Sequence, residues 1–391
     1  MARKPVSTPA SKSTHKPNTP PHGPNGVPPR VVLVLQGGGA LGAYQVGVMQ
    51  ALQAAGIEPE WAIGTSIGAI NAALIAGNDP SARLARLQGF WESLRWRSPL
   101  SGLPFEPGAL NPLANLSVMS QGVPGFFVPN PAAAWGPMAP VGVLRASYYD
   151  TAPLAETLRA HVDFERINRC EMRLTVGAVN VTSGEMRYFD SRSEPLGVDH
   201  VMASGALPPA FPAVRIDDEL YWDGGIYSNT PIEAVLDDNP RRDALIFAVQ
   251  LWNPIGAEPD SIWQVMGRQK DIQYASRADS HIARQRQIHR LRHVISELAQ
   301  HLPAGQRDTP EGRELAGWGC KTTVHIVRLL APRLASEDHT KDIDFTPAGI
   351  RLRCEAGFAD AQEVIEQAPW RQPVDPREGV LVHDHLSRFK M

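Results

Sequence analysis

The residues of this chain that could do chemistry lie in three clusters rich in glycine. The first is the run Gly37, Gly38 and Gly39, whose backbone N–H groups could hold a negative charge. The second places Ser66 on a tight turn, and the third places Asp223 directly before two glycines. N–H donors, a hydroxyl and a carboxylate are the parts that acyl transfer needs. The sequence therefore predicts acyl-transfer chemistry.

The glycine run also fits a rival interpretation, because with Gly42 it completes the pattern G-x-G-x-x-G between a strand and a helix. A dinucleotide site also needs an acidic residue at the end of the second strand to bind the ribose. Glu58 and Glu60 precede the expected second strand at residues 61–63, and Ser66 follows it. The acids are misplaced, so we favour acyl transfer over nucleotide binding.

Ser66 is the centre of the pattern G-x-S-x-G, which it forms with Gly64 and Gly68. The two glycines leave room for a sharp turn from a strand into a helix, and this turn exposes the serine hydroxyl at the helix N-terminus. That end of a helix also stabilises developing negative charge. A serine that only caps the helix is the alternative. We favour a nucleophile because the glycine run and a carboxylate accompany it.

Asp223 is the candidate base for this serine. It follows a short apolar segment and precedes Gly224 and Gly225, so its side chain is expected to project from a tight turn at a strand end. A carboxylate in a partly desolvated pocket is basic enough to take a hydroxyl proton directly. A plain Asp-Gly-Gly turn is the alternative. Asp217 and Asp218 lie on a neighbouring polar loop and are weaker candidates.

Short apolar runs alternate with helical segments along most of the chain, which predicts βαβ units. We therefore expect a three-layer α/β/α fold with a mostly parallel central sheet, followed by a mainly helical C-terminal extension. The expected strands are residues 31–35, 61–64, 173–181, 186–189, 245–251 and 322–330, and the expected helices are residues 43–55, 67–76, 83–97, 262–302 and 347–366.

The chain divides into a tail (1–30), a catalytic domain (31–255) and a C-terminal extension (256–391). The tail is basic and rich in Pro, Ser and Thr, which predicts disorder rather than a secretory signal. No apolar run approaches the length of a membrane span. We expect a cytoplasmic protein that is soluble, or peripheral on a membrane or on a lipid or polyester granule.

The composition excludes several classes of protein. Of the 391 residues, 43% are hydrophobic and 20% are charged, as in a soluble globular protein. The net charge of −3 gives no field that would favour nucleic acid as a partner. Cys170, Cys320 and Cys354 are widely separated, which argues against a disulfide framework or a zinc site. We expect no metal and no cofactor.

The three clusters, in this order, resemble the motifs of the patatin-like phospholipase family, over roughly residues 31–251. The resemblance extends beyond the chemical groups themselves. It includes the elbow helix (64–72), a block of Ser, Ala, Pro and Phe (203–212), and a base motif made of Asp223, Gly224 and Gly225 with Asn229 and Pro231.

The resemblance implies a patatin-like fold and a dyad of Ser66 and Asp223 that works without histidine. It also implies that the amides of Gly37, Gly38 and Gly39 form the oxyanion hole. The implied activity is that of a serine lipid acyl hydrolase, a phospholipase A or carboxylic-ester hydrolase that forms an acyl-enzyme. A lipid or another acyl ester is then the substrate.

Two positions depart from the family pattern, in which an acid often precedes the glycines and a basic residue precedes the last one. Gln36 and Leu41 occupy these positions here. The resemblance therefore implies ester hydrolysis more directly than a preference for phospholipids. The C-terminal extension resembles that of a bacterial subgroup linked to storage polyesters. Hydrolysis of a storage polyester or its oligomers, and a non-catalytic scaffold that binds lipid, are the alternatives.

A Ser–Asp–His triad of the α/β-hydrolase kind is another alternative, since histidines follow Asp223. The glycine run, however, begins the helix that directly precedes the strand leading to Ser66. The glycine run and the serine are therefore too close in sequence for the α/β-hydrolase fold. The candidate histidines also lie in an Arg-rich helical stretch, where a solvated face is expected. They are His281, His289, His293 and His301.

Two segments suggest how a lipid substrate could reach the site. Residues 98–144 contain many Pro and Gly and a single charged side chain, Glu106, which suggests a cover or mouth that meets lipid. Residues 268–292 are rich in Arg and suggest contact with an anionic surface. The alternatives are aromatic side chains that pack on the core and charges that only solvate a helix.

Overall fold

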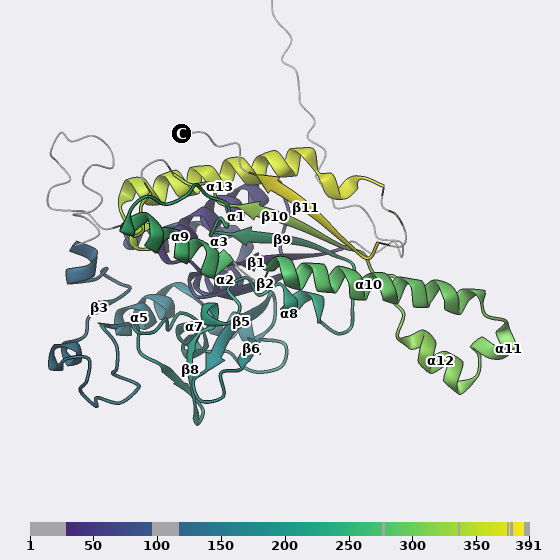
Figure 1. Cartoon of the computed structure of the whole chain (residues 1–391), viewed down its shortest axis with the longest axis horizontal. Coiled ribbons are helices and arrows are strands. Elements are labelled where there is room, and N and C mark those ends of the chain that lie inside the picture. The colour runs from purple at the N-terminus through teal and green to yellow at the C-terminus, as the bar shows by residue number, and fades with distance from the viewer. Residues whose placement is uncertain are drawn as a thin grey trace, which may run out of the picture.

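The computed structural model describes residues 29–95, 117–275, 278–334, 337–373, 375 and 378–386. Within these ranges, nine strands form one central sheet with helices on both faces (Figure 1). The strands are β1 (Arg30–Leu35), β2 (Trp61–Thr65), β5 (Arg173–Asn180), β6 (Met186–Asp190), β7 (Val214–Ile216), β8 (Glu219–Asp223), β9 (Ala244–Gln250), β10 (Val324–Leu330) and β11 (Val380–Leu386).

The strand order is β11-β10-β9-β1-β2-β5-β8-β7, and β6 also pairs with β5. The pairs from β11 through to β5 are all parallel, whereas β6, β7 and β8 join by antiparallel pairs. The prediction of a mostly parallel sheet in a three-layer α/β/α fold is confirmed. A separate short ribbon pairs β3 (Val128–Pro129) with β4 (Tyr149–Asp150).

The two sides of β1 show why this strand is apolar throughout. Val31, Leu33 and Leu35 point into one core, and Val32 and Val34 point into the other. This is the period of two that a strand covered on both faces requires. The first core is covered by α1 (Ala43–Ala54), α2 (Ile67–Ala76), α3 (Pro80–Ser93), α5 (Ala152–His161), α7 (Val198–Ser204) and α13 (Pro347–Gln367); the second by α8 (Glu233–Leu236) and the start of α10 (Ala278–His301).

Residues beyond 255 build part of this same framework. The strands β10 and β11 extend the central sheet from β9, and α13 packs on α1. The two helices approach so closely that a Cβ atom on Gly47 would lie 1.9 Å from the Cys354 carbonyl oxygen. A Cβ on Gly357 would lie 2.0 Å from the carbonyl oxygen of Tyr44. Glycine is therefore required on both helices.

Sequence patterns located most elements but missed two features of the C-terminal region. The stretch 262–302, expected as one helix, contains α9 (Ile262–Ala275) and α10 as separate elements. The Pro-rich end contains β11, which we did not predict. Its seven residues pair in parallel with the whole of β10. The region thus combines its helices with two strands of the central sheet.

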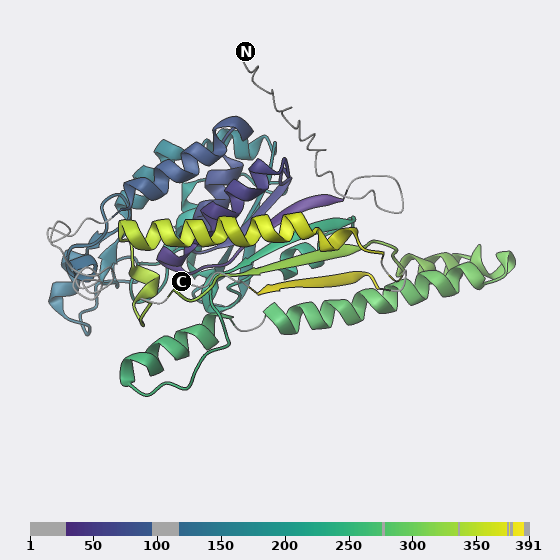
Figure 2. The same cartoon turned by 90° about the horizontal axis from the view of Figure 1, so that it is seen from above.

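The far end of α10 projects from the body and forms an arm with α11 (Ala304–Arg307) and α12 (Pro310–Gly317), as Figure 2 shows from above. In the described part of the chain, no helix is both long enough and apolar enough to cross a membrane. Most of the predicted tail, residues 1–28, lies outside the described residues. So does the first part of the suggested cover, residues 98–116.

Candidate active site

The glycine run leaves the end of β1 and turns into η1 (Gly39–Gly42), directly before α1. The peptide groups of Gly37 are fully used in holding this turn. Its N–H donates to the Asn229 carbonyl at 3.3 Å, and its carbonyl accepts from Asn229 Nδ2 at 3.1 Å and Trp252 Nε1 at 2.8 Å. The N–H groups of Gly38 and Gly39 have no hydrogen-bond partner among the described residues.

Close packing explains why this turn is made of glycine. A Cβ atom on Gly37 would lie 2.5 Å from Asn229 Oδ1 and 2.8 Å from Ser66 Cβ. Gly39 has a φ of +56°, and a Cβ there would lie 2.2 Å from the carbonyl oxygen of Asp342. Because Asp342 belongs to η4 (Lys341–Ile343), the C-terminal region rests directly on the glycine turn.

Gln36 shows how the chain works without an acid before the glycines. Its buried side-chain amide accepts from the backbone N–H groups of Leu251 and Trp252. The same amide donates to Thr230 Oγ1 at 2.7 Å and to the carbonyl of Tyr274 at 3.1 Å. An amide can donate and accept at once, whereas a carboxylate can only accept. Gln36 therefore ties the glycine turn to the residues that follow β9, to Thr230 and to α9.

Ser66 lies at the sharp turn that its sequence pattern predicts. It has a φ of 58° and a ψ of −129° and forms the N-cap of α2. Gly64 and Gly68 allow this turn, because a Cβ on Gly64 would lie 2.2 Å from the Gly68 carbonyl carbon. The Ser66 N–H donates to both the carbonyl and the hydroxyl of Ser204, at 3.1 Å each. Such backbone strain is typical of functional residues.

Asp223 is the last residue of β8 and is almost fully buried. Its Oδ1 accepts from the Gly225 N–H at 2.7 Å, and among the described residues its Oδ2 has no partner in hydrogen-bond geometry. Burial raises the pKa of Asp223 from 3.8 to about 7, and the Ser66 hydroxyl and the Gly225 N–H partly oppose this rise. The Ser66 hydroxyl thus interacts with the carboxyl, although in the rotamer present it does not form a well-aligned hydrogen bond.

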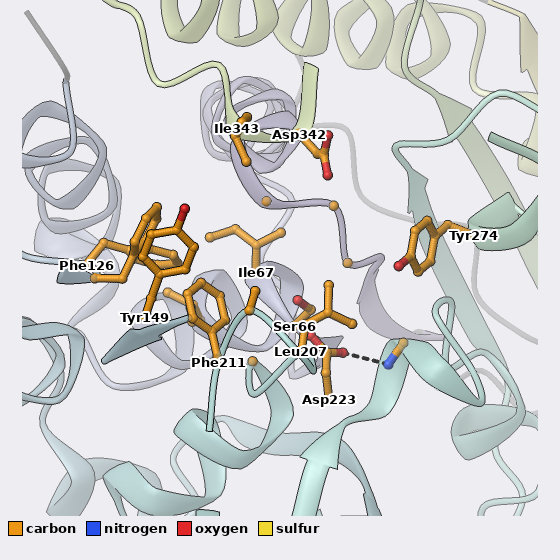
Figure 3. A pocket seen from close by; sticks show the side chains of 18 of the residues that line it. Ser66, Ile67, Phe126, Tyr149, Leu207, Phe211, Asp223, Tyr274, Asp342 and Ile343 are labelled. Carbon is orange, nitrogen blue, oxygen red and sulfur yellow. Dashed lines mark hydrogen bonds between the residues drawn. The ribbon is translucent and has the colours of Figure 1, made fainter. Parts of the chain in front are cut away.

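The two side chains meet at the floor of a cavity of about 170 Å³ (Figure 3). One end of the cavity is aromatic and apolar, and its rings lie 4.9–6.3 Å apart, centroid to centroid. The residues of this aromatic end are Phe126, Phe127, Tyr149, Phe211 and Phe345. The other end is more polar and is lined by Asn229, Trp252, Tyr274 and Asp342.

The structure brings every predicted chemical group to this one cavity: Ser66, Asp223, Gly37, Gly38 and Gly39 all line it. The supporting glycines of the three motifs shape the turns around it, namely Gly42, Gly64, Gly68, Gly224 and Gly225. The four candidate histidines do not line it; His281, His289, His293 and His301 all lie on α10. Among the described residues, no cluster of His, Cys, Asp and Glu could hold a metal ion.

Several lining residues had no signal in the sequence. Trp252 follows β9, and Tyr274, Asp342, Ile343 and Phe345 come from the C-terminal region. They lie roughly two hundred residues or more from Ser66 along the chain, and no local pattern marks them. The end of β9 brings Trp252 to the cavity, and the docking of α9 and η4 beside the glycine turn brings the others. The C-terminal region therefore forms part of the site itself.

Comparison with known families gives two matches in this chain. A model described as patatin-like phospholipase matches residues 33–236, and one described as patatin phospholipase matches residues 272–377. The first covers the glycine turn, the serine elbow and Asp223, and the second begins just before Tyr274. A curated relative, a cGAMP-activated phospholipase of Pseudomonas aeruginosa, is 29% identical over 119 residues. That match covers 27% of this chain and 36% of the relative, about a third of its length.

Solved structures resemble the chain only distantly. VipD from Legionella pneumophila matches with a TM-score of 0.40 and 16% identity, over 87% of this chain and 67% of that one. ExoU from the type III secretion system of Pseudomonas aeruginosa, in complex with SpcU, matches with a TM-score of 0.28 and 18% identity. That match covers 96% of this chain and 83% of the other.

Proposed function

We propose that this chain, which belongs to the patatin-like phospholipase family, hydrolyses lipid acyl esters with Ser66 as nucleophile and Asp223 as base. One observation carries the proposal. The serine is held on a strained turn beside a buried carboxylate whose pKa is raised to about 7. These two groups line one cavity with an apolar end, together with two backbone N–H groups that have no partner among the described residues.

The first chemical step is attack of Ser66 Oγ on the ester carbonyl carbon. The hydroxyl proton passes to Asp223, whose Oδ2 is buried and has no other hydrogen-bond partner in the described structure. An ordinary carboxylate is a weak base, but burial raises the pKa of Asp223 to about 7. A base with its pKa near the working pH combines adequate strength with a large ionised fraction. No histidine is needed for this step.

The amides of Gly38 and Gly39 are the proposed oxyanion donors. Gly37 was expected to contribute as well, but its N–H already donates to Asn229. Its carbonyl, held by Asn229 and Trp252, instead fixes the peptide plane that carries the Gly38 N–H. In a trans peptide the two groups point in opposite directions. Anchoring the carbonyl of Gly37 on one side therefore directs the N–H of Gly38 to the other.

The acyl-enzyme is then hydrolysed by the reverse set of proton transfers. Once the alcohol has left, Asp223 is ionised again and can take a proton from a water molecule. The water oxygen attacks the acyl carbon, and Ser66 Oγ recovers its proton as the acid is released. The same two side chains serve both halves of the reaction.

The aromatic end of the cavity is suited to the acyl chain. Apart from the tyrosine hydroxyl its lining is hydrocarbon, and burying methylene groups there is favourable by about 0.8 kcal/mol each. This supports a lipid acyl ester more directly than a short, polar polyester repeat. Leu41 places no cation on the glycine turn, so this turn offers no positive charge to a phospholipid headgroup.

A lipid surface is the partner we propose for the face around this cavity. Met119 lines the cavity and is half exposed. Trp135, at the end of the short 3-10 helix Pro131–Trp135, and Met138 are exposed. Arg145 is the one charged residue between 117 and 148. Phe126 and Phe127 are buried, so within the suggested cover the side chains split between core and surface. Contact of the basic stretch 268–292 with an anionic surface stays a prediction.

Labelling with a fluorophosphonate tests the proposal. The probe phosphonylates an activated serine, so we expect labelling of the wild-type chain, none of Ser66→Ala and strongly reduced labelling of Asp223→Asn. Hydrolysis of p-nitrophenyl and phospholipid esters should follow the same order. Labelling that survives Ser66→Ala would falsify the assignment of the nucleophile. A wild-type chain that binds lipid vesicles but neither labels nor hydrolyses would instead identify a scaffold.

A further inference from the structure

We propose that Tyr274 is a further catalytic residue, whose hydroxyl donates a hydrogen bond to the leaving-group oxygen of the ester. The inference rests on the proposed function, because it concerns the step in which the Ser66 adduct releases its alcohol. Tyr274 lies in the last turn of α9, within the C-terminal region. The residue would make that region a direct participant in the chemistry.

The position of Tyr274 in the cavity is the first argument. The side chain lines the cavity on the side opposite the aromatic end, with Ser66 between the two (Figure 3). Its hydroxyl is directed toward Ser66 and Asp223. An ester bound at Ser66 with its acyl chain among the phenyl rings must direct its alcohol away from them. The alcohol then extends toward Tyr274.

The way in which Tyr274 is held is the second argument. Its carbonyl accepts from Gln36 Nε2 at 3.1 Å and from Asn229 Nδ2 at 3.2 Å, and its ring packs on Trp252 with centroids 5.0 Å apart. The same three side chains hold the glycine turn. The tyrosine and the proposed oxyanion donors are therefore fixed relative to each other by shared contacts. Such pre-organisation is what catalytic donors require.

The state of the hydroxyl is the third argument. It has no hydrogen-bond partner in the part of the chain that the structure describes, so its proton is available to a substrate. Burial, together with the carboxylates of Asp223 and Asp342, raises the pKa of Tyr274, which keeps it protonated. Tyr149, at the aromatic end, differs in this respect, because its hydroxyl donates to the carbonyl of Met119 at 2.7 Å.

The tetrahedral adduct on Ser66 collapses, the bond between the acyl carbon and the alcohol oxygen breaks, and that oxygen keeps the electron pair. The proton that Asp223 took from Ser66 moves to the same oxygen and completes the alcohol. Tyr274 keeps its own proton throughout and stabilises the negative charge that develops on the oxygen before protonation. This hydrogen bond matters most when the leaving alkoxide is strongly basic.

Tyr274→Phe is the test, because it removes the hydroxyl and keeps the ring against Trp252. Single-turnover acylation should be measured with the ethyl and the p-nitrophenyl ester of one fatty acid. A hydrogen bond to a charged group is worth on the order of 10-fold to 100-fold in rate, and we expect a loss of this size for the ethyl ester. The p-nitrophenyl ester, whose leaving group is weakly basic, should react nearly as in the wild type.

Tyr149→Phe is the matched control, since it removes a hydroxyl from the opposite end of the same cavity and should not separate the two esters. If Tyr274→Phe slows both esters equally, or slows neither, the inference is wrong. Fluorophosphonate labelling of Ser66 in Tyr274→Phe keeps this failure distinct from a failure of the proposed function. If Tyr274→Phe is labelled at the wild-type rate, the proposed roles of Ser66 and Asp223 are unaffected. If hydrolysis persists in Ser66→Ala, the proposed function itself is wrong.

Discussion

Replacing Asp223 by Asn should abolish hydrolysis and at the same time stabilise the folded chain. The reason is that burial, which makes Asp223 a useful base, also makes its ionised form costly. Its pKa rises from 3.8 to about 7 in the folded state. Asn has nearly the same shape, can accept the Gly225 N–H through its Oδ1, and never ionises. The variant therefore keeps the local contacts and loses the buried charge.

The sign and the size of the effect follow from the two pKa values. The folded chain binds the Asp223 proton more tightly than the unfolded chain does, so this group makes the free energy of unfolding fall as pH rises from about 4 to about 7. At 1.36 kcal/mol per pH unit, the loss is on the order of 4 kcal/mol above pH 7. Asp223→Asn should recover a sizeable part of that amount at pH 8 and almost nothing at pH 4.

Urea unfolding at pH 4, 6 and 8 measures this difference directly. Asp218→Asn is the control, because it makes the same chemical change on an exposed position of the neighbouring turn. We expect Asp218→Asn to follow the wild type at every pH, and the gain of Asp223→Asn to grow as pH rises. A gain of equal size at pH 4 and pH 8, or no gain at pH 8, would refute the argument that a buried charge at Asp223 costs stability.

Two further predictions concern the catalytic step. The kcat/KM of the wild type for a p-nitrophenyl ester should rise with pH to a plateau, with a midpoint near the Asp223 pKa of about 7. The reason is that only ionised Asp223 can take the Ser66 proton in the proposed mechanism. A flat profile between pH 5 and 9 contradicts this prediction. Gly39→Ala should lower kcat on the order of 100-fold, as loss of one oxyanion donor does. The reason is that the φ of +56° at Gly39 and the nearby Asp342 carbonyl leave no room for a Cβ atom. Gly56→Ala is the control in the same assay, because Gly56 also has a positive φ but no atom lies near its Cβ position.

The parts of the fold that could be predicted from the sequence are those that local patterns determine. A strand covered on both faces reads as a continuous apolar run, as residues 31–35 do, and glycines mark the turns at Gly64 and Gly68. Those signals located β1, β2 and the serine elbow. The strand β11 carries His383, Asp384 and His385 and has no such run, because it lies at the edge of the sheet.

The site divides in the same way. Ser66, Asp223 and the glycine run follow from short motifs, but the role of each backbone group depends on partners that are distant in sequence. The Gly37 N–H is occupied because Asn229, 192 residues away, lies against it. Gln36 departs from the family pattern, and the structure explains it by the hydrogen bonds of its side chain with Thr230, Leu251 and the carbonyl of Tyr274. Contacts of this kind have no signature in a single sequence.

The C-terminal region illustrates how much of such a site can come from outside its motifs. An ester hydrolase must bind an acyl chain and an alcohol on opposite sides of one serine. In the proposed mechanism Phe345 lies on the acyl side and Tyr274 on the alcohol side, and both come from beyond residue 255. The carbonyl of Asp342 rests on Gly39 between them. We therefore infer that the motifs determine which bond is cleaved and that the C-terminal region selects the ester that is presented to them.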